Sequence, residues 1–262
     1  MKIYDTIKSL FGKKEEDNAV KIIRLGETGS TNDYLRNYQP GEGEEMTVVV
    51  ADYQSEGRGQ GSNRWESEAG KNLLFSVLLH PVHVPVVRQF LLSEFGAVAL
   101  KDALGNYVRE GITLKWPNDI YWNDLKLSGT LIETRLSGGR IRDCIFGVGL
   151  NVNQTEFRSD APNPVSLCQI LGREIDRDEL LGCIVSSFRR LYPQLLGGGY
   201  IDLPALYHDS LYRKHGFHSF TDNNGEFEGA IVEVEDDGHL VLRDREGVIR
   251  SYLFKEIEYG KI

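Results

Sequence analysis

Three glycine-ended turn signals near the C-terminus restrict the fold of this chain more than any other feature. They are Asn223-Asn224-Gly225, Asp236-Asp237-Gly238 and Arg245-Glu246-Gly247. Such triplets connect antiparallel strands, because glycine adopts the positive φ that tight hairpins require. The strand-like runs around them are 217–221, 226–234, 239–243 and 248–254. About five short antiparallel strands in so few residues predict a small SH3-like β-barrel over residues 215–262.

The larger part of the chain, residues 21–214, mixes strand and helix patterns and predicts an α+β domain. Apolar runs predict strands at 21–25, 46–51, 72–80, 113–116, 120–122, 127–135 and 140–150. Helical spacing predicts helices at 86–107, 165–171, 177–196 and 202–211. A further helix is expected to begin at Ser30, an N-cap residue with Asp33 three positions later. We expect residues 1–20 to form a short N-terminal extension and residues 151–164 a loop.

Composition and charge exclude several classes of protein. The formal net charge is −9, which argues against broad, non-specific nucleic-acid binding but leaves room for a local basic pocket. The three cysteines form no CxxC pair and fit reduced structural thiols. The sequence has neither a signal peptide nor an apolar run of about 18 residues. We therefore expect a soluble cytoplasmic protein without a membrane partner.

The segment Gly57-Arg58-Gly59-Gln60-Gly61 has the composition of a loop that binds an anion. Alternating glycines let the backbone approach a ligand, and Arg58 places a guanidinium between two of them. A Rossmann fingerprint would need glycine at position 62, which is serine, and a Walker loop would need glycine at position 65, which is tryptophan. Neither nucleotide motif is present. Taken alone, the segment is typical of a flexible surface turn.

Two further segments allow both a structural and a functional interpretation. Lys115-Trp116-Pro117-Asn118-Asp119 predicts a turn, because proline favours extended geometry in the residue before it and Asn-Asp favours a turn. Lys126 lies near the start of an apolar strand. Its side chain either points outward from an edge strand or is directed inward, where its ammonium would attract a carboxylate or phosphate. Gly147 and Gly149 alternate in a strand, which indicates either tight packing or the close approach of a ligand.

The remaining chemistry-bearing residues predict no separate site. His80 and His83 flank a proline without a neighbouring cysteine or aspartate in the sequence, which disfavours a metal pair. The acidic runs at 13–17 and 233–237 fit solvated surface. No nucleophilic triad is recognisable. We therefore predict no dedicated metal site.

Five segments occur together and in one order. They are Ser30-Thr31-Asn32, Gln54 with Gly57-Arg58-Gly59, Lys115-Trp116-Pro117-Asn118-Asp119, Lys126-Leu127-Ser128-Gly129 and Gly149-Leu150-Asn151-Val152. In this combination the chain resembles a biotin–protein ligase, also called biotin–[acetyl-CoA-carboxylase] ligase, over most of its length. The resemblance implies a catalytic domain at 21–214, similar to class II aminoacyl-tRNA synthetases, with a mixed sheet, flanking helices and the C-terminal SH3-like domain. It implies that biotin and ATP give biotinyl-5′-AMP and pyrophosphate, and that a lysine of a biotin carboxyl carrier domain then accepts the biotinyl group.

The resemblance also implies roles for individual residues. Those implied for biotin are Ser30, Thr31, Asn32, Gln54, Gly57, Arg58, Gly59, Lys126 and Gly129. Those implied for ATP and the adenylate are Arg58, Gln60, Trp65, Lys115, Asn118, Asp119, Lys126 and Asn151. Trp65 would stack on adenine and Asn151 would bond its edge. Lys126 and Arg58 would stabilise charge at the reacting carboxylate and phosphate, and Asp119 would help the acceptor lysine to lose its proton. Mg²⁺ is expected to arrive with ATP.

Two departures from the family pattern affect these expectations. Family members often read GRGRRG where this chain has Gly57-Arg58-Gly59-Gln60-Gly61-Ser62, so we expect weaker adenylate retention unless Arg64 or Lys71 reaches the site. Some members carry an N-terminal winged helix that binds DNA, for which residues 1–20 are too short. A monofunctional enzyme without a nucleic-acid partner is therefore expected. A homodimer stays open, as do two other functions: a lipoate or octanoyl ligase of related fold, and a non-catalytic biotin-binding module.

Overall fold

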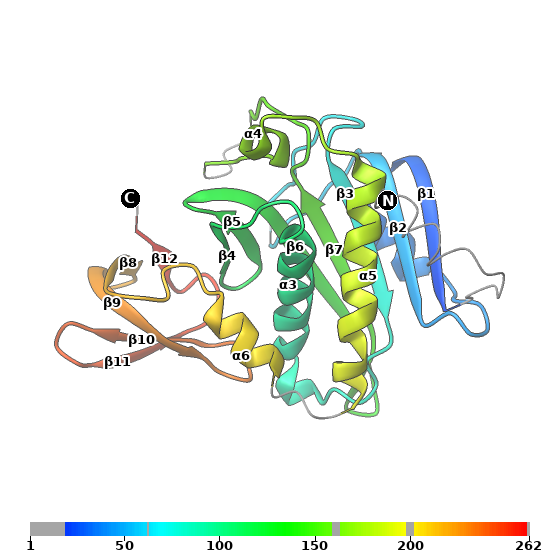
Figure 1. Ribbon diagram of the computed structural model, residues 1–262. Helices are drawn as coiled ribbons and strands as arrows, with labels where there is room; N and C mark the ends of the chain where they lie inside the picture. Colours follow the sequence, from blue (N-terminus) through cyan, green and yellow to red (C-terminus); the bar gives the residue numbers. More distant parts are fainter. Residues whose placement is uncertain (1–18, 62, 159–162, 198–201, 261–262) are drawn as a thin grey trace.

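A seven-stranded mixed sheet forms the larger part of the protein (Figure 1). The computed structural model describes residues 19–61, 63–158, 163–197 and 202–260. The strands are β1 (Val20–Thr28), β2 (Met46–Gln54), β3 (Leu73–Leu79), β4 (Ile112–Lys115), β5 (Asp119–Trp122), β6 (Leu125–Ser137) and β7 (Arg140–Leu150). Their order across the sheet is β1-β2-β3-β7-β6-β5-β4. β1 and β2 are parallel, and α2 (Thr31–Asn37) provides the crossover that a parallel pair requires. All other neighbouring strands of this sheet are antiparallel.

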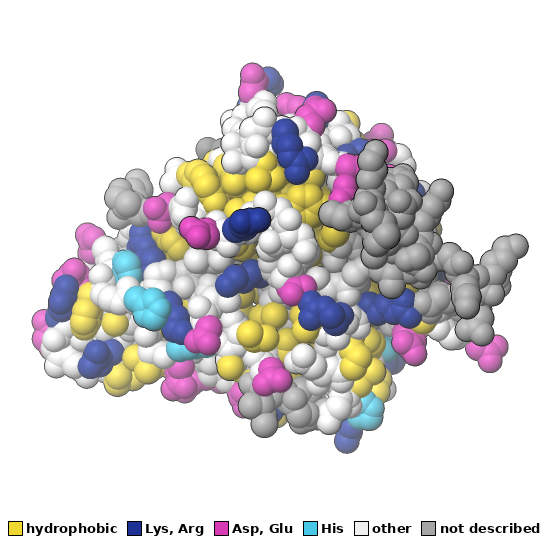
Figure 2. Space-filling model, viewed as in Figure 1, with side chains coloured by type: hydrophobic (Ala, Val, Ile, Leu, Met, Phe, Trp, Pro, Cys, Tyr) yellow, Lys and Arg dark blue, Asp and Glu magenta, His cyan; other side chains and the backbone are white. Residues whose placement is uncertain are grey.

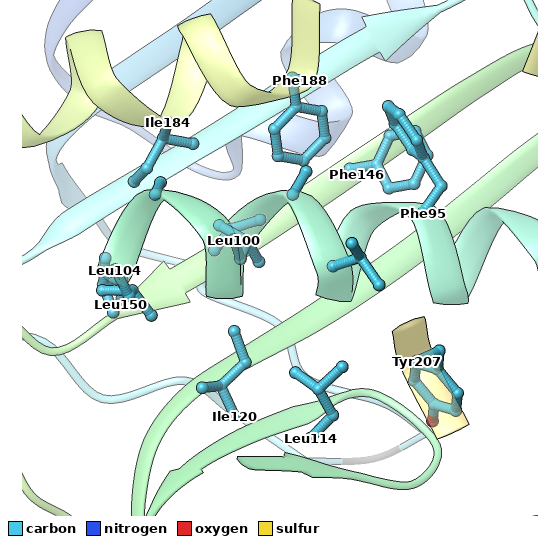
Figure 3. Packing of buried hydrophobic residues seen from close by; sticks show 14 of the residues in the cluster. Phe95, Leu100, Leu104, Leu114, Ile120, Phe146, Leu150, Ile184, Phe188 and Tyr207 are labelled. Carbon is cyan, nitrogen blue, oxygen red and sulfur yellow. The ribbon is translucent and has the colours of Figure 1, made fainter. Parts of the chain in front are cut away.

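The main core lies between this sheet and two helices, α3 (Phe90–Leu104) and α5 (Arg177–Leu196), which pack side by side on one face (Figure 1). Phe95 of α3 packs edge-to-face against Phe188 of α5, with ring centroids 5.3 Å apart, and lies 5.7 Å from the ring of Phe146 in β7 (Figure 3). Such aromatic pairs contribute about 0.5–1.5 kcal/mol each beyond the area that they bury. The apolar spacing of both helices therefore serves one shared core.

The opposite face of the sheet carries α2 and has a much smaller apolar cluster, formed by Leu35, Val49, Leu78 and Ile145. Residues in a strand point alternately to the two faces. In β7 the large residues Phe146 and Leu150 belong to the main core, whereas glycines occupy positions 147 and 149 on the face of α2. This face thus has room for something other than apolar side chains.

A second, antiparallel sheet contains the C-terminal strands. They are β8 (His218–Asp222), β9 (Gly225–Val234), β10 (Leu240–Asp244), β11 (Ile249–Tyr252) and β12 (Glu258–Tyr259), paired in the order β11-β10-β9-β8-β12. Gly225, Gly238 and Gly247 all have positive φ, as their turns require. The Trp116 indole nitrogen donates a hydrogen bond to Gly238 O at 2.9 Å, which fastens this sheet to the larger one.

The predicted α+β class, with a mixed sheet, flanking helices and a small C-terminal β domain, is confirmed. Among the described strands, however, the pairing of the small sheet is linear from β11 to β12 rather than closed between these two edges. β12 was not predicted, because two residues are too few to show an alternating pattern. The expected boundary between residues 214 and 215 falls between α6 (Asp202–Asp209) and β8.

The helix predicted at 86–107 is divided. A 3₁₀ turn, η1 (Val86–Arg88), precedes α3, which begins at Phe90 and ends at Leu104 before Gly105. The β-branched residues Val86 and Val87 disfavour an α-helix before Phe90, and Gly105 disfavours its continuation beyond Leu104. The predicted helix at 165–171 is α4 (Leu167–Leu171).

Several other expectations concern single residues or the chain ends. The three cysteines are free, and Cys144 is buried in the main core. His80 bonds Asp143 through Nδ1 at 2.9 Å, a partner that is far away in the sequence. Residues 1–18 of the expected extension, including the acidic run, lie outside the described residues, and Val20 already belongs to β1.

Within the described ranges no helix has the length and apolar character needed to cross a membrane. Over the face that carries α3 and α5, Lys and Arg are interspersed with Asp and Glu (Figure 2).

Candidate active site

A cavity of about 540 Å³ is lined by both sheets. The large domain contributes the start of α2, the end of β2, the glycine loop (residues 57–65), the turn at 115–119, and parts of β6 and β7. The C-terminal domain contributes residues from the segment 254–259. Cavities of this size enclose small organic ligands.

Glycines of β6 and β7 form the floor of the cavity. A Cβ atom added to Gly147 would lie 2.2 Å from Asn32 Oδ1, and one added to Gly149 would lie 2.2 Å from Trp65 Cε2. A Cβ atom added to Gly129 in β6 would lie 3.1 Å from Trp65 Cζ3. Side chains from two distant segments therefore rest directly on the sheet, which larger residues at these positions would prevent. The alternating glycines of β7 thus reflect a close approach to the backbone, here by protein side chains.

A polar network occupies the end of the cavity next to α2. Gln54 Oε1 accepts hydrogen bonds from Thr31 N at 2.6 Å and from Thr31 Oγ1 at 3.0 Å. Ser76 Oγ lies 2.7 Å from Thr31 Oγ1 and 2.6 Å from Asn32 Oδ1. Asn32 Nδ2 donates to Glu133 Oε2 at 2.9 Å. Because these buried dipoles hold one another in fixed orientations, this end is suited to a neutral polar ligand group.

The start of α2 differs from the expected capping arrangement. Ser30 is the N-cap residue, but its side chain makes no capping hydrogen bond. The Gln54 side chain, which comes from the end of β2, satisfies the Thr31 amide instead. The free N–H groups at a helix start need partners, and here the partner comes from a neighbouring strand rather than from the local sequence.

The glycine loop is a tight hairpin above the floor. Arg58 and Arg64 form a β-bridge, Gly59 N donates to Asn63 O at 2.8 Å, and Trp65 N donates to Gly57 O at 3.1 Å. A Cβ at Gly57 would lie 2.9 Å from Trp65 O, so glycine is needed there for the chain to pass. Backbone hydrogen bonds thus link the described residues on the two sides of this loop, which a featureless surface turn would lack.

Carboxylates fix the position of Arg58. Its guanidinium donates to Asp33 Oδ1 at 2.7 Å and lies 3.7 Å from Glu133 Oε1. Arg36 pairs with the same two carboxylates. Because Arg58 and Asp33 are each 39% exposed, their ion pair contributes little stability and can be exchanged for another anion.

Two polar atoms of the loop are buried without a hydrogen-bond partner in the described structure. They are Trp65 Nε1 and Gln60 Oε1, and both residues line the cavity. A buried donor or acceptor left without a partner costs about 1–3 kcal/mol. A ligand in the cavity reaches these two atoms only if the loop moves, because protein atoms cover both of them.

Lys126 points inward to the cavity rather than outward from the strand, the other orientation that the sequence allowed. Its Nζ lies 2.7 Å from Asp119 Oδ2 and 5.9 Å from the centre of the Trp65 ring. The Lys126 and Asp119 side chains are only 20% and 19% exposed. The ion pair is thus shielded from solvent and lies at the cavity wall, where a competing anion would interact strongly with the ammonium.

Lys115 lies in a cage of tyrosines. Its Nζ donates to Tyr121 Oη at 3.0 Å and lies 4.6 Å from the ring of Tyr121 and 4.8 Å from the ring of Tyr259. Burial is the main cause that lowers the pKa of Lys115, and the nearby Lys126 charge acts in the same direction. Asp119 opposes both effects. Tyr259 belongs to β12, so the C-terminal domain helps to hold a cation of the large domain.

The structure brings together all but two of the site residues that the sequence predicts. Those that line the cavity are Ser30, Thr31, Asn32, Gln54, Arg58, Gly59, Gln60, Trp65, Lys115, Asn118, Asp119, Lys126 and Gly129. Gly57 shapes the loop from behind the lining. Asn151 is buried outside the lining, where Nδ2 donates to Val165 O at 3.1 Å, so the geometry gives no support to the expected contact with adenine.

Sequence reasoning missed several residues of the cavity and of the network behind it. Ser76 and Glu133 belong to the polar network, and Phe254, Ile257, Glu258 and Tyr259 of the C-terminal domain line the cavity. Ser76 had a weak signal, because it is a polar residue in the otherwise apolar strand β3. The C-terminal residues gave no signal, since only the packing of the two domains brings them to the cavity.

The lining is cationic although the chain as a whole is acidic. Its positive side chains are Arg58, Arg64, Lys115 and Lys126, and its carboxylates are Asp119 and Glu258. The net charge of the chain is −9. Such a local reversal of sign attracts an anionic ligand to one place on the molecule.

Comparison with known proteins agrees with this geometry. Residues 27–151 match the model of the biotin/lipoate A/B protein ligase family. The bifunctional ligase/repressor BirA of Bacillus subtilis is 31% identical over 258 residues, which cover 95% of this chain and 77% of that protein. The chain belongs to the biotin/lipoate A/B protein ligase family. The resemblance that the five motifs indicate is therefore confirmed.

Other relatives are similar over nearly their whole length. The biotin–[acetyl-CoA-carboxylase] ligase of Paracoccus denitrificans is 28% identical over 236 residues, which cover 85% of this chain and 94% of that enzyme. The structure of the biotin protein ligase from Aquifex aeolicus in complex with biotin and ATP has a TM-score of 0.75 and 26% sequence identity. The matched region covers 92% of this chain and 99% of the Aquifex aeolicus chain. Both domains of this family member therefore have counterparts in a biotin protein ligase.

Proposed function

We propose that this protein is an ATP-dependent biotin–protein ligase, which joins biotin to a lysine of a biotin carboxyl carrier domain. The observation that carries the proposal is the cationic cavity, which combines a fixed polar network at one end with Lys126 and Lys115 at the other. The polar end suits the neutral ureido group of biotin, and the cationic end suits its carboxylate and the phosphates of ATP. Mg²⁺ enters as part of the ATP substrate.

In the first step a carboxylate oxygen of biotin attacks the α-phosphorus of ATP, and the bond to pyrophosphate breaks. Two anions must approach each other, so their repulsion is the main barrier that the site has to offset. Lys126 exchanges its partner Asp119 for the ligand anions and bridges carboxylate and phosphate. Arg58 adds a planar pair of donors from the glycine loop. No proton is transferred from biotin, because its carboxyl group is already ionised at neutral pH.

In the second step the acceptor amine attacks the carbonyl carbon of the mixed anhydride, an amide bond forms, and AMP leaves. The acceptor lysine loses one proton to solvent before it attacks as a neutral amine, and its nitrogen loses a second proton as the amide forms. Asp119 is the carboxylate paired with Lys126, and the departure of Lys126 toward the phosphate leaves it available to accept this second proton. Lys115, held by Tyr121 and Tyr259, remains beside the phosphate side and stabilises the AMP leaving group.

The test is a coupled assay of both steps. Purified protein with biotin and Mg·ATP should release pyrophosphate, and a biotin carboxyl carrier domain should then gain one biotinyl group by mass spectrometry. Lys126→Met should slow both steps by at least tenfold. Lys71→Met is the matched control, because Lys71 lies outside the cavity lining with its ammonium 4.0 Å from Glu174. Absence of ATP-dependent biotinylation by the wild-type protein would refute the proposal.

The two alternatives give distinct results in the same assay. A lipoate or octanoyl ligase would release pyrophosphate or modify its carrier only with those acids. A non-catalytic module would bind biotin without pyrophosphate release. We favour the ligase because Lys126 and Arg58 both line the cavity, and binding of biotin alone does not require two cations at the phosphate end. The cytoplasm as its compartment and a homodimer remain predictions.

A further inference from the structure

The segment between β11 and β12 brings the C-terminal domain onto the glycine loop. Phe254 of this segment lines the cavity and packs edge-to-face against Trp116, with ring centroids 6.3 Å apart. The next residue, Lys255, has a φ of +72°, a backbone conformation that is unfavourable for a residue with a Cβ atom. Strained residues persist where the surrounding structure holds them, and here the strain turns the Lys255 side chain toward the loop.

Lys255 and Gly61 fit together in detail. A Cβ atom built on Gly61 would lie 2.5 Å from Lys255 Nζ and 3.3 Å from Lys255 Cε. The lysine ammonium therefore occupies the place where a side chain at position 61 would begin. Gly61 itself has a φ of +68°, so glycine is favoured there both by the backbone and by the neighbouring lysine.

The charge of Lys255 is not used elsewhere in the described part of the chain. Its ammonium has no carboxylate partner there, and it lies 5.9 Å from the centre of the Phe254 ring. Arg58, by contrast, pairs with Asp33, and Lys71 lies near Glu174. The tip of the glycine loop contributes only neutral residues, Gln60 and Gly61, next to a cavity that attracts anions. An unpaired cation thus lies at the one part of the loop that lacks a charge of its own.

We propose that Lys255 supplies, from the C-terminal domain, the second positive charge of the glycine loop. Its ammonium fastens the loop tip and slows the loss of the acyl-adenylate, whose phosphate is anionic. Lys255 is a positioning residue, because it lies behind Gly61 and outside the cavity lining. The inference rests on the proposed function, since it requires an acyl-adenylate to retain. It also changes the sequence-based expectation, in which Arg64 or Lys71 would have to replace the missing charge.

Retention of the adenylate is the quantity to measure. Wild-type protein is loaded with labelled biotin and Mg·ATP, excess pyrophosphatase is added, and release of the labelled adenylate is followed after a chase with unlabelled ligand. Lys255→Met, which keeps the stem and removes the charge, should release the adenylate about fivefold faster, with an unchanged melting temperature. Lys255→Arg should restore most of the retention. Lys71→Met should release at the wild-type rate.

A second pair of variants tests the contact itself. Gly61→Ala places a methyl group against the flexible end of Lys255 and displaces its ammonium, so it should speed release, by at most as much as Lys255→Met. Gly43→Ala is the matched control, because Gly43 also has a positive φ, of +82°, but a Cβ there meets no atom within 4 Å. It introduces the same backbone strain without the contact, so release should be unchanged.

Three results are separable. If wild-type protein forms no adenylate, the proposed function fails and this inference falls with it. If wild-type protein forms the adenylate and Lys255→Met, with an unchanged melting temperature, releases it at the wild-type rate, the role of Lys255 is refuted while the proposed function stands. If Lys255→Met unfolds, Lys255→Gly relieves the strained backbone and removes the charge, and wild-type release by that variant would equally refute the role.

Discussion

Replacing Gly149 by alanine should disable the cavity while leaving the fold intact. Gly149 lies in the middle of the floor, in an extended strand, so alanine introduces no backbone strain. Its methyl group would lie 2.2 Å from Trp65 Cε2 and 2.5 Å from Trp65 Nε1. Carbon atoms in ordinary contact are at least about 3.4 Å apart, so the indole must withdraw from the floor by about 1 Å.

The structure sets the size of the two effects. Overpacking in a closed core costs about 1–3 kcal/mol, but Trp65 is only half-buried and borders an open cavity. The free energy of unfolding should therefore fall by only about 1 kcal/mol. The displaced ring moves into the space that the ligand needs, so the affinity for the adenylate should fall at least tenfold, which corresponds to about 1.4 kcal/mol.

Urea denaturation and adenylate binding by calorimetry measure these effects separately. The control is Gly182→Ala in the middle of α5, where an added Cβ meets no atom within 4 Å. It should stabilise the protein by about 0.5–1 kcal/mol, because alanine is a better helix former than glycine, and leave binding unchanged. Wild-type adenylate affinity in a folded Gly149→Ala protein would mean that Trp65 does not rest on the floor in solution.

Three other predictions follow from single contacts. Burial raises the pKa of Glu94 from 4.5 to about 7. As the pH rises through this range, the unfolded chain loses the proton while the folded protein keeps it, so the free energy of unfolding falls. Because one pKa unit corresponds to about 1.4 kcal/mol, Glu94→Gln should gain about 3 kcal/mol at pH 8 and nothing at pH 4 in denaturation curves; equal gains at both pH values would contradict the assignment. Asp119→Asn should tighten biotin binding several-fold, because Lys126 loses its competing carboxylate, yet slow transfer to the carrier in single-turnover assays. Weaker biotin binding would show that Asp119 instead holds Lys126 in place. Trp65→Phe leaves a smaller aromatic face at the cavity, and should weaken adenylate binding by about 1 kcal/mol in calorimetry because less ring area can stack on a ligand; an unchanged affinity would show that the ring does not contact the ligand.

Much of the fold was predictable because its signals are local. The glycine-ended turns of the C-terminal sheet and the apolar runs of β2 and β3 depend on a few neighbouring residues. Tertiary contacts add partners that the local sequence does not show. Ser30 is the predicted N-cap residue, but the Gln54 side chain rather than its own satisfies the helix start, and Asn151 Nδ2 donates to the carbonyl of Val165.

The sequence by itself indicated which residues give the cavity its charge and its floor: the cations Arg58, Lys115 and Lys126, and the glycines that keep the floor open. Only the tertiary structure decided how these residues are held. Packing of α2 on the sheet brings Asn32 to Ser76, and domain packing brings Tyr259 to Lys115 and Lys255 to Gly61. These partners are dozens to nearly two hundred positions apart. No local pattern records such a pairing, because the free energy that selects it comes from burial across the whole core rather than from neighbouring residues.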